Sequence, residues 1–138
     1  MQQLAEMLKS NQLKVTPQRL AIFNILYHTT EHPSAEKIYK QLQPTHPTMS
    51  LATVYKTLDT LKKSALVQEL NVGEDSFRYD ANINPHPHAI CLKCSRVIDL
   101  HTDELIDTVK KIQQQTDFEI VSEKFYFYGY CPECKTSK

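Results

Sequence analysis

The stretch SLATVYKTLDTL at residues 50–61 decides how the first half of the chain is interpreted. Ser50 is a residue type that caps helix N-termini, and leucine or valine at positions 51, 54, 58 and 61 recurs at helical spacing. The opposite face carries small, polar and basic side chains, namely Ala52, Thr53, Tyr55, Lys56 and Thr60. Such a helix can enter the major groove of DNA. An ordinary solvent-exposed face is nevertheless the more common origin of this composition.

Two β-prone segments follow this helix, and they favour the DNA-binding interpretation over an ordinary solvent-exposed face. Residues 66–70 (LVQEL) and 76–79 (SFRY) flank the turn sequence VGED at residues 72–75, which predicts a hairpin. Upstream, apolar residues at positions 4, 7 and 8 indicate a first helix. Thr16-Pro17 and Pro33-Ser34 indicate the starts of two more, and PTHPT at residues 44–48 predicts a loop. Helices followed by a hairpin are typical of a winged helix-turn-helix, which favours DNA binding.

Composition and charge narrow the class of protein. With 138 residues, 41% hydrophobic and 23% charged, the chain is expected to be globular. The net charge is zero, but residues 1–65 carry eight Lys and Arg against four acids, whereas the remainder carries eight against twelve. This asymmetry is weak support for a polyanion-binding first half. No apolar run is long enough to span a membrane, and the N-terminus lacks a signal peptide. We therefore expect a cytoplasmic protein, where disulfides are rare.

The second half is predicted to be a separate small α+β unit. Residues 1–80 would form the winged helix, 81–86 (ANINPH) a hinge, and 87–138 the second domain. Short strands are expected at residues 90–92 and 96–98, and Thr102 is expected to cap a helix whose apolar face is formed by Leu105, Ile106, Val109 and Ile112. Residues 118–130 are strongly β-prone. Because this unit is too short for a sizeable core, a metal clip and a dimer partner would have to supply the missing stability.

All four cysteines fall into two C-x-x-C pairs, and 36 residues separate the pairs. The spacing lets both sulfurs of a pair bind one ion, and two pairs complete a tetrahedron. Four thiolates without an open position are typical of a structural zinc site. The alternative is that the thiols are free or redox-active. We predict one structural Zn²⁺ per chain, bound by Cys91, Cys94, Cys131 and Cys134.

Histidines and carboxylates near the first pair suggest a second metal site. His86 and His88 are two residues apart, so on a strand both imidazoles share a face. Asp80 and Asp99 lie nearby in the sequence, and His32 precedes Pro33 in the first half. A mixed N/O ligand set suits Fe²⁺, Mn²⁺ or Zn²⁺. From composition alone, a lone histidine such as His32 is more often an ordinary surface residue, and for the His86/His88 pair metal binding and no metal binding are about equally expected.

No motif in the sequence indicates an enzyme. Serines and histidines form no recognisable nucleophile motif, and with only two glycines the chain has no Gly-rich phosphate loop.

Several motifs together resemble one known family. They are TPQR at 16–19, EHPSA at 31–35, SLATVYKTL at 50–58, HPHAICLKC at 86–94, VIDL at 97–100 and YGYCPEC at 128–134. Over nearly its whole length the chain resembles the ferric uptake regulator (Fur) family, and most closely its peroxide-sensor branch (PerR). The resemblance implies a winged-helix DNA-binding domain, a hinge and an α/β dimerisation domain. It also implies a homodimer that binds palindromic, double-stranded operator DNA.

The resemblance further implies the residues that act. The regulatory metal, Fe²⁺ or Mn²⁺, would be bound by His32, Asp80, His86, His88 and Asp99. DNA contacts are expected from Lys14, Arg19, Ser50, Thr53, Tyr55 and Lys56. Iron-uptake regulators usually carry Glu where this chain has Asp99, whereas the peroxide branch carries Asp. In that branch bound Fe²⁺ reacts with peroxide, and the oxidised ligands here would be His32 and His86, after which metal and DNA are released.

Other functions remain open on the sequence. An iron- or zinc-uptake regulator of the same family would share most of these motifs. The C-x-x-C pairs could serve a dithiol redox enzyme, or a zinc-ribbon interaction module that binds no DNA. Finally, Ser95 stands where family members commonly have Gly, a change that we expect to be harmless.

Overall fold

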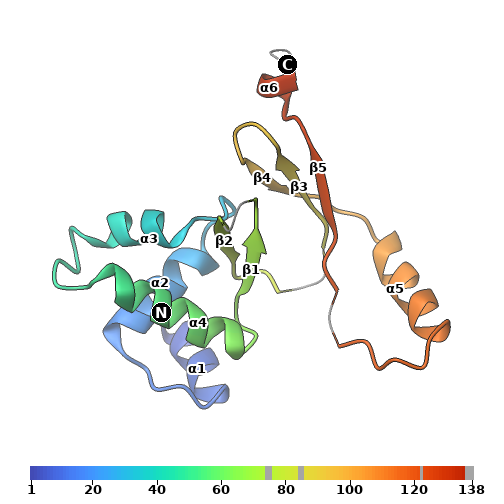
Figure 1. Cartoon of the computed structure of the whole chain (residues 1–138). Helices are drawn as coiled ribbons and strands as arrows, with labels where there is room; N and C mark the ends of the chain where they lie inside the picture. The colour runs from blue at the N-terminus through green and yellow to red at the C-terminus, as the bar shows by residue number, and fades with distance from the viewer. Residues whose placement is uncertain (74–75, 84–85, 122, 136–138) are drawn as a thin grey trace. The chain divides into compact units, whose positions relative to one another are not determined.

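The chain forms two compact units, Met1–Ile83 and Asn84–Lys138. The computed structural model describes residues 1–73, 76–83, 86–121 and 123–135. Within these described ranges, the first unit contains four helices and a hairpin, and the second a three-stranded sheet with two helices (Figure 1). The predicted hinge, residues 81–86, includes residues 84 and 85, which lie outside the described part. Among the helices of the described ranges, none has the length and apolar character needed to cross a membrane.

Three of the helices described in the first unit begin where the sequence predicts, each after a capping side chain. The helices are α1 (Gln2–Ser10), α2 (Pro17–Tyr27), α3 (Ala35–Leu42) and α4 (Leu51–Lys63). The side-chain oxygens of Thr16, Ser34 and Ser50 accept hydrogen bonds from the backbone N–H three residues later, at 3.1, 3.2 and 3.1 Å. Each bond satisfies an N–H that has no partner within its helix, which contributes about 1 kcal/mol per cap.

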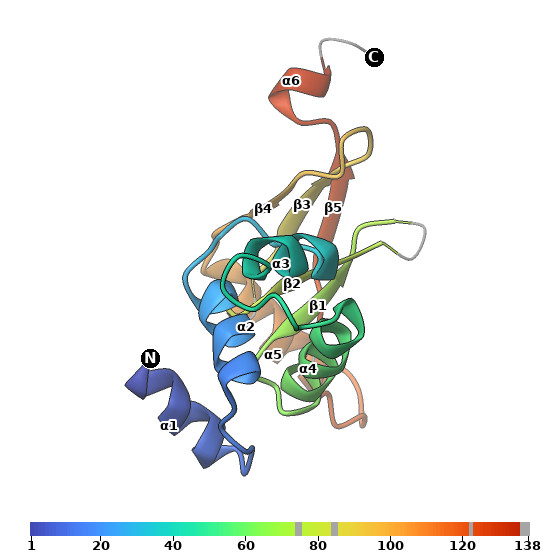
Figure 2. The same ribbon diagram turned by 90° about the vertical axis from the view of Figure 1, so that its left-hand side faces the viewer.

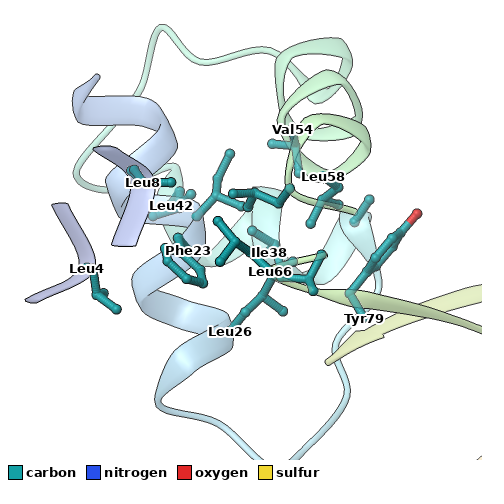
Figure 3. Close-up of a cluster of buried hydrophobic side chains, with 14 of the residues drawn as sticks. Leu4, Leu8, Phe23, Leu26, Ile38, Leu42, Val54, Leu58, Leu66 and Tyr79 are labelled. Carbon is teal, nitrogen blue, oxygen red and sulfur yellow. The ribbon is translucent and has the colours of Figure 1, made fainter. Parts of the chain in front are cut away.

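The core of the first unit lies where the helices meet (Figure 3). Phe23 from α2, Ile38 from α3 and Leu58 from α4 are each at most 1% exposed. Burying an aliphatic or aromatic side chain of this size contributes roughly 1.5–3 kcal/mol, so this cluster fixes how α3 and α4 pack. Tyr79 closes one side of the cluster, and its hydroxyl points away from it (Figure 3). That hydroxyl donates a hydrogen bond to Glu69 Oε2 at 3.0 Å.

The predicted hairpin is confirmed in the described residues. It consists of β1 (Gln68–Asn71) and β2 (Phe77–Asp80), which are antiparallel. Part of the predicted turn, residues 74 and 75, lies outside the described residues. The backbone N–H of Tyr79 donates to the carbonyl of Pro33 at 3.0 Å, so β2 is tied to the segment before α3. Helices α1–α4 and this hairpin together form the expected winged helix.

The second unit is built on a mixed sheet with strand order β4-β3-β5. Strand β3 (His88–Cys91) is antiparallel to β4 (Val97–Asp99) and parallel to β5 (Tyr126–Gly129). A short helix, α6 (Pro132–Lys135), follows β5 at the end of the sheet where β3 turns into β4 (Figures 1 and 2). This arrangement brings the two C-x-x-C segments to the same end of the sheet.

Two expectations about the second unit are wrong in detail. Helix α5 (Glu104–Gln114) has Asp103 rather than Thr102 at its cap position, although Thr102 Oγ1 accepts a bond from the N–H of Glu104 at 3.3 Å. Of the β-prone residues 118–130, only 126–129 form a strand among those described. The reason is that a strand needs a partner, and β3 is only four residues long.

Candidate metal and DNA-binding sites

The four cysteine sulfurs lie within 4.8 Å of one another. Cys94 Sγ is 3.8 Å from Cys131 Sγ, far longer than the S–S bond of a disulfide, about 2.05 Å. Four sulfurs at about 2.3 Å from a tetrahedral ion are separated by roughly 3.8 Å. The sulfur cluster therefore has the dimensions of a Cys₄ metal site.

Backbone groups around the cluster favour the metal-binding form of Cys91. Its Sγ accepts hydrogen bonds from the N–H of Cys94 at 3.4 Å and of Cys131 at 3.5 Å. These bonds lower the pKa of Cys91 to about 6, so its thiolate, the form that binds metal, predominates at neutral pH. A side-chain hydrogen bond with Cys131, aided by burial, raises the pKa of Cys134 to about 12. The cluster thus holds protons that a cation would displace.

A salt bridge joins the two cysteine segments from outside. Arg96 Nη1, which follows the first pair, lies 3.0 Å from Glu133 Oε2, between the cysteines of the second pair. Both side chains are more than half exposed, so the pair itself contributes little stability. It shows that the two cysteine segments lie side by side at this end of the sheet.

In the first unit, His32 lies beside Asp80. His32 Nε2 is 3.3 Å from Asp80 Oδ2, and the two residues are 2% and 6% exposed. His32 also has a left-handed backbone, with φ at 54°. That conformation costs a non-glycine residue roughly 1–2 kcal/mol, and it persists because the surrounding packing fixes it. Such strain is typical of residues held in place for binding.

In the second unit, His86 and His88 converge on Asp99. The Nε2 atoms of both imidazoles lie 3.2 Å from the same carboxylate oxygen, Asp99 Oδ1, and the two rings are 4.4 Å apart. The sheet creates this arrangement, because His88 on β3 is directly paired with Asp99 on β4. Ligands about 2.1 Å from one ion in octahedral geometry are about 3 Å apart. The three residues therefore fit part of a mixed N/O metal site.

The residues expected to contact DNA lie on the first unit. Tyr55 on α4 is 44% exposed, Ser50, Lys56 and Lys14 are exposed, and Thr53 is half-buried. Arg19 Nη1 donates to the carbonyl of Lys14 at 2.7 Å, which places these two basic residues side by side. Ser50 uses its hydroxyl as the cap of α4.

One contact on this surface escapes sequence reasoning. The hydroxyl of Tyr55 donates a hydrogen bond to the carboxylate of Glu36, 19 positions away on α3. No sequence motif contains both residues, and only the packing of α3 against α4 brings them together. The left-handed backbone of His32 is likewise invisible in the sequence, although the following proline is a hint of unusual geometry.

Comparison with known proteins assigns the chain to a family. The model of the "Ferric uptake regulator family" matches residues 10–128. A "Transcriptional regulator PerR" of Clostridium acetobutylicum is 50% identical over 98% of this chain and 98% of its own length. A "Peroxide-responsive repressor PerR" of Staphylococcus epidermidis is 39% identical over 89% of this chain and 82% of its own length.

A solved structure agrees with these sequence relatives. The "Campylobacter jejuni peroxide stress regulator" is 34% identical, has a TM-score of 0.78, and is matched over 95% of this chain and 98% of its own length. The family model and these relatives indicate a regulator of transcription rather than an enzyme. The chain belongs to the ferric uptake regulator family.

Proposed function

We propose that the chain is a metal-dependent, peroxide-responsive repressor that binds palindromic operator DNA as a homodimer. The observation that carries this function is the convergence of His86 and His88 on one oxygen of Asp99. Such a group has the composition and spacing for Fe²⁺ or Mn²⁺. The names of the relatives in Staphylococcus epidermidis and Campylobacter jejuni agree with peroxide as the signal.

The regulatory ion would take ligands from both units. His32 and Asp80 belong to the first unit, while His86, His88 and Asp99 belong to the second. An ion that binds all five favours the arrangement in which the two groups are close, and it does so by its differential affinity for that arrangement. Metal binding is thereby coupled to DNA affinity, because the first unit carries the DNA-contacting residues Lys14, Arg19, Ser50, Thr53, Tyr55 and Lys56.

Peroxide would act through the imidazoles. An Fe²⁺ ion held by His32, Asp80, His86, His88 and Asp99 would activate peroxide, which is itself the two-electron oxidant, so no net electron is drawn from the iron. His32 or His86 then exchanges a ring C–H for C–OH, and each peroxide consumed leaves one water. An oxidised imidazole is a poorer ligand, so the five-residue set loses affinity for the ion and the repressor leaves the operator. Mn²⁺ supports DNA binding without this reactivity.

The cysteine cluster would hold one structural Zn²⁺. Its four sulfurs have the spacing of a tetrahedral ion, and a four-thiolate site without an open position is typical of structural rather than catalytic zinc. Zinc would join β3 to the end of β5, and β3 carries His88. The structural ion would thus stabilise the strand that carries His88 of the proposed regulatory site.

Dimerisation is supported by the apolar surface of the second unit. Helix α5 has no buried residue, and Ile106, Phe127 and Tyr128 are each 55% exposed. Large apolar side chains left exposed on so small a unit favour an interface. A two-fold homodimer would present two α4 helices, which suits a palindromic operator.

The function is tested with metal-loaded protein and a pool of random-sequence duplexes. We expect Fe²⁺- or Mn²⁺-loaded protein to enrich a palindrome, and low peroxide to abolish binding of the Fe²⁺ form only. Peptide mass spectrometry should then find one added oxygen on His32 or His86, with His28 and His46 as internal controls. An Fe²⁺ form that keeps its affinity and gains no oxygen would instead indicate an iron-uptake regulator. A response confined to Zn²⁺ would indicate a zinc-uptake regulator.

A further inference from the structure

Glu36 and Tyr55 connect the outer faces of α3 and α4. Glu36 lies in the first turn of α3 and is exposed. Its carboxylate accepts a hydrogen bond from the hydroxyl of Tyr55, on the second turn of α4. Ile38 on α3 and Leu58 on α4 are buried members of the core cluster, which fixes the two helices. The bond is therefore made between elements whose relative position is already set.

The protonation of the two groups makes the contact a strong one. The hydrogen bond with Tyr55 lowers the pKa of Glu36, and the same bond raises the pKa of Tyr55. At neutral pH the carboxylate is thus ionised and the phenol is neutral. A neutral donor on an ionised acceptor gives a charge-assisted bond, which is stronger than a bond between two neutral groups.

Packing alone does not fix the ring of Tyr55. A cavity of about 310 Å³ lies beside it, lined among others by Ser34, Glu36 and Phe77. With this space on one side and solvent on the other, the tyrosine has room for other rotamers. The hydrogen bond to Glu36 is the contact that selects the orientation seen here.

We propose that Glu36 is a specificity-determining residue that positions Tyr55 for reading DNA bases. The inference rests on the proposed function, in which α4 enters the major groove. A preorganised tyrosine loses little conformational entropy on binding, so its base contact discriminates between sequences. The carboxylate adds nothing to general affinity, since a negative charge at this surface repels phosphate. Glu36 therefore contributes to selectivity, whereas the basic residues contribute to affinity.

Glu31 provides a matched control for the loss of one negative charge. It lies just before α3, is exposed, and pairs with Lys37 at 2.9 Å. It differs from Glu36 in its partner, which is a lysine and not the tyrosine of α4. Replacing Glu31 or Glu36 with alanine removes the same charge near the start of the same helix. A difference between the two variants thus reports on the contact with Tyr55.

The experiment measures discrimination by the Mn²⁺-loaded, full-length protein. The two probes are the palindromic duplex most enriched from the random pool and a scrambled duplex of equal length and composition, at one salt concentration. We expect Glu36→Ala to lower the ratio of the affinity for the palindrome to the affinity for the scrambled duplex about tenfold. A loss of this size corresponds to one specific base contact. Glu31→Ala should leave the ratio unchanged. Glu36→Gln, whose amide oxygen still accepts a bond, should restore most of it.

A double-mutant cycle decides whether Glu36 acts through the tyrosine hydroxyl. In a Tyr55→Phe background, Glu36→Ala should have no further effect on the ratio. Equal ratios for the Glu36→Ala and Glu31→Ala variants would overturn the proposal, and so would an undiminished Glu36 effect in the Tyr55→Phe background. If the unmodified protein itself prefers no duplex, the proposed function fails. If it discriminates and Glu36→Ala does so equally well, only the role of Glu36 fails.

Discussion

His32 Nε2 lies 3.3 Å from Asp80 Oδ2, although 48 positions separate the two residues along the chain. The hairpin is responsible for this proximity. The N–H of Tyr79 donates to the carbonyl of Pro33 at 3.0 Å, which aligns the end of β2 with the segment before α3. A predicted ligand from each segment is thereby held within the first unit, before any contribution from the second.

Removing the carboxylate of this pair is expected to weaken regulatory metal binding. Asp80→Asn keeps the shape of the side chain but removes a negative oxygen donor, so the affinity for Mn²⁺ should fall at least about tenfold. Titration calorimetry on zinc-loaded protein measures this loss. Asp59→Asn is the control, because Asp59 is exposed and pairs with Lys63. Equal affinities in the two variants would exclude Asp80 as a ligand.

Lengthening the carboxylate at position 99 is expected to uncouple metal binding from peroxide sensing. Asp99 faces His88 across the β3–β4 pair, so Glu at this position would place its carboxylate one methylene further from the backbone. We expect Asp99→Glu to bind Mn²⁺ and DNA, while its Fe²⁺ form adds less oxygen to His32 and His86 under peroxide. Quantitative peptide mass spectrometry checks this. Unchanged oxidation would show that the length of this side chain does not tune the response.

Loss of one cysteine is expected to release zinc and destabilise the second unit. Cys131→Ser removes one of four thiolates, and the binding free energy of a structural zinc is largely folding free energy. Elemental analysis should find much less than one zinc per chain, and size-exclusion chromatography should show loss of the dimer. Leu92→Ala, a change at a 60% exposed position inside the first cysteine pair, should keep both. A Cys131→Ser protein with full zinc would contradict the Cys₄ assignment.

Ser95→Gly is expected to stabilise the protein. Ser95 has φ at 64°, and its N–H donates to the carbonyl of Cys91 at 3.0 Å. Since the left-handed conformation favours glycine, the change should raise the free energy of unfolding by up to about 1 kcal/mol. Urea unfolding of zinc-loaded protein measures it. Ser64→Gly, at φ −89°, should give no gain, so equal effects at both positions would refute this explanation.

The link between Glu36 and Tyr55 is expected to depend on pH. Because the pKa of Glu36 is lowered in the folded protein, its stabilising effect is complete above the ordinary value of 4.5. That effect is lost as the pH falls through the lowered value. Tyr55→Phe should raise the pKa of Glu36, and carboxyl NMR titration of both proteins should show the change. An identical titration in the two proteins would mean that the hydrogen bond is absent in solution.

The sequence by itself determined the helices of the first unit and the hairpin, and it predicted the residue types of the two candidate metal sites. The caps at Thr16, Ser34 and Ser50 are local signals, since a side chain bonds an N–H three residues away. The C-x-x-C pairs are equally local, and their residue type and spacing alone predict four thiolates on one ion. For the same reason, the motifs sufficed to predict the family.

Only the tertiary structure decided which distant residues meet. The short partner strand β3 limits the length of β5. The β-propensity of residues 118–130 therefore predicted a longer strand than the structure has. We expected serine in place of the family's usual glycine at position 95 to be harmless. Ser95 is strained, because its backbone is left-handed. The bond from Tyr55 to Glu36, like the pairing of His88 with Asp99, depends on helix packing and strand register. Helix packing and strand register are set by free energies summed over the whole core, and a local sequence pattern does not contain that sum.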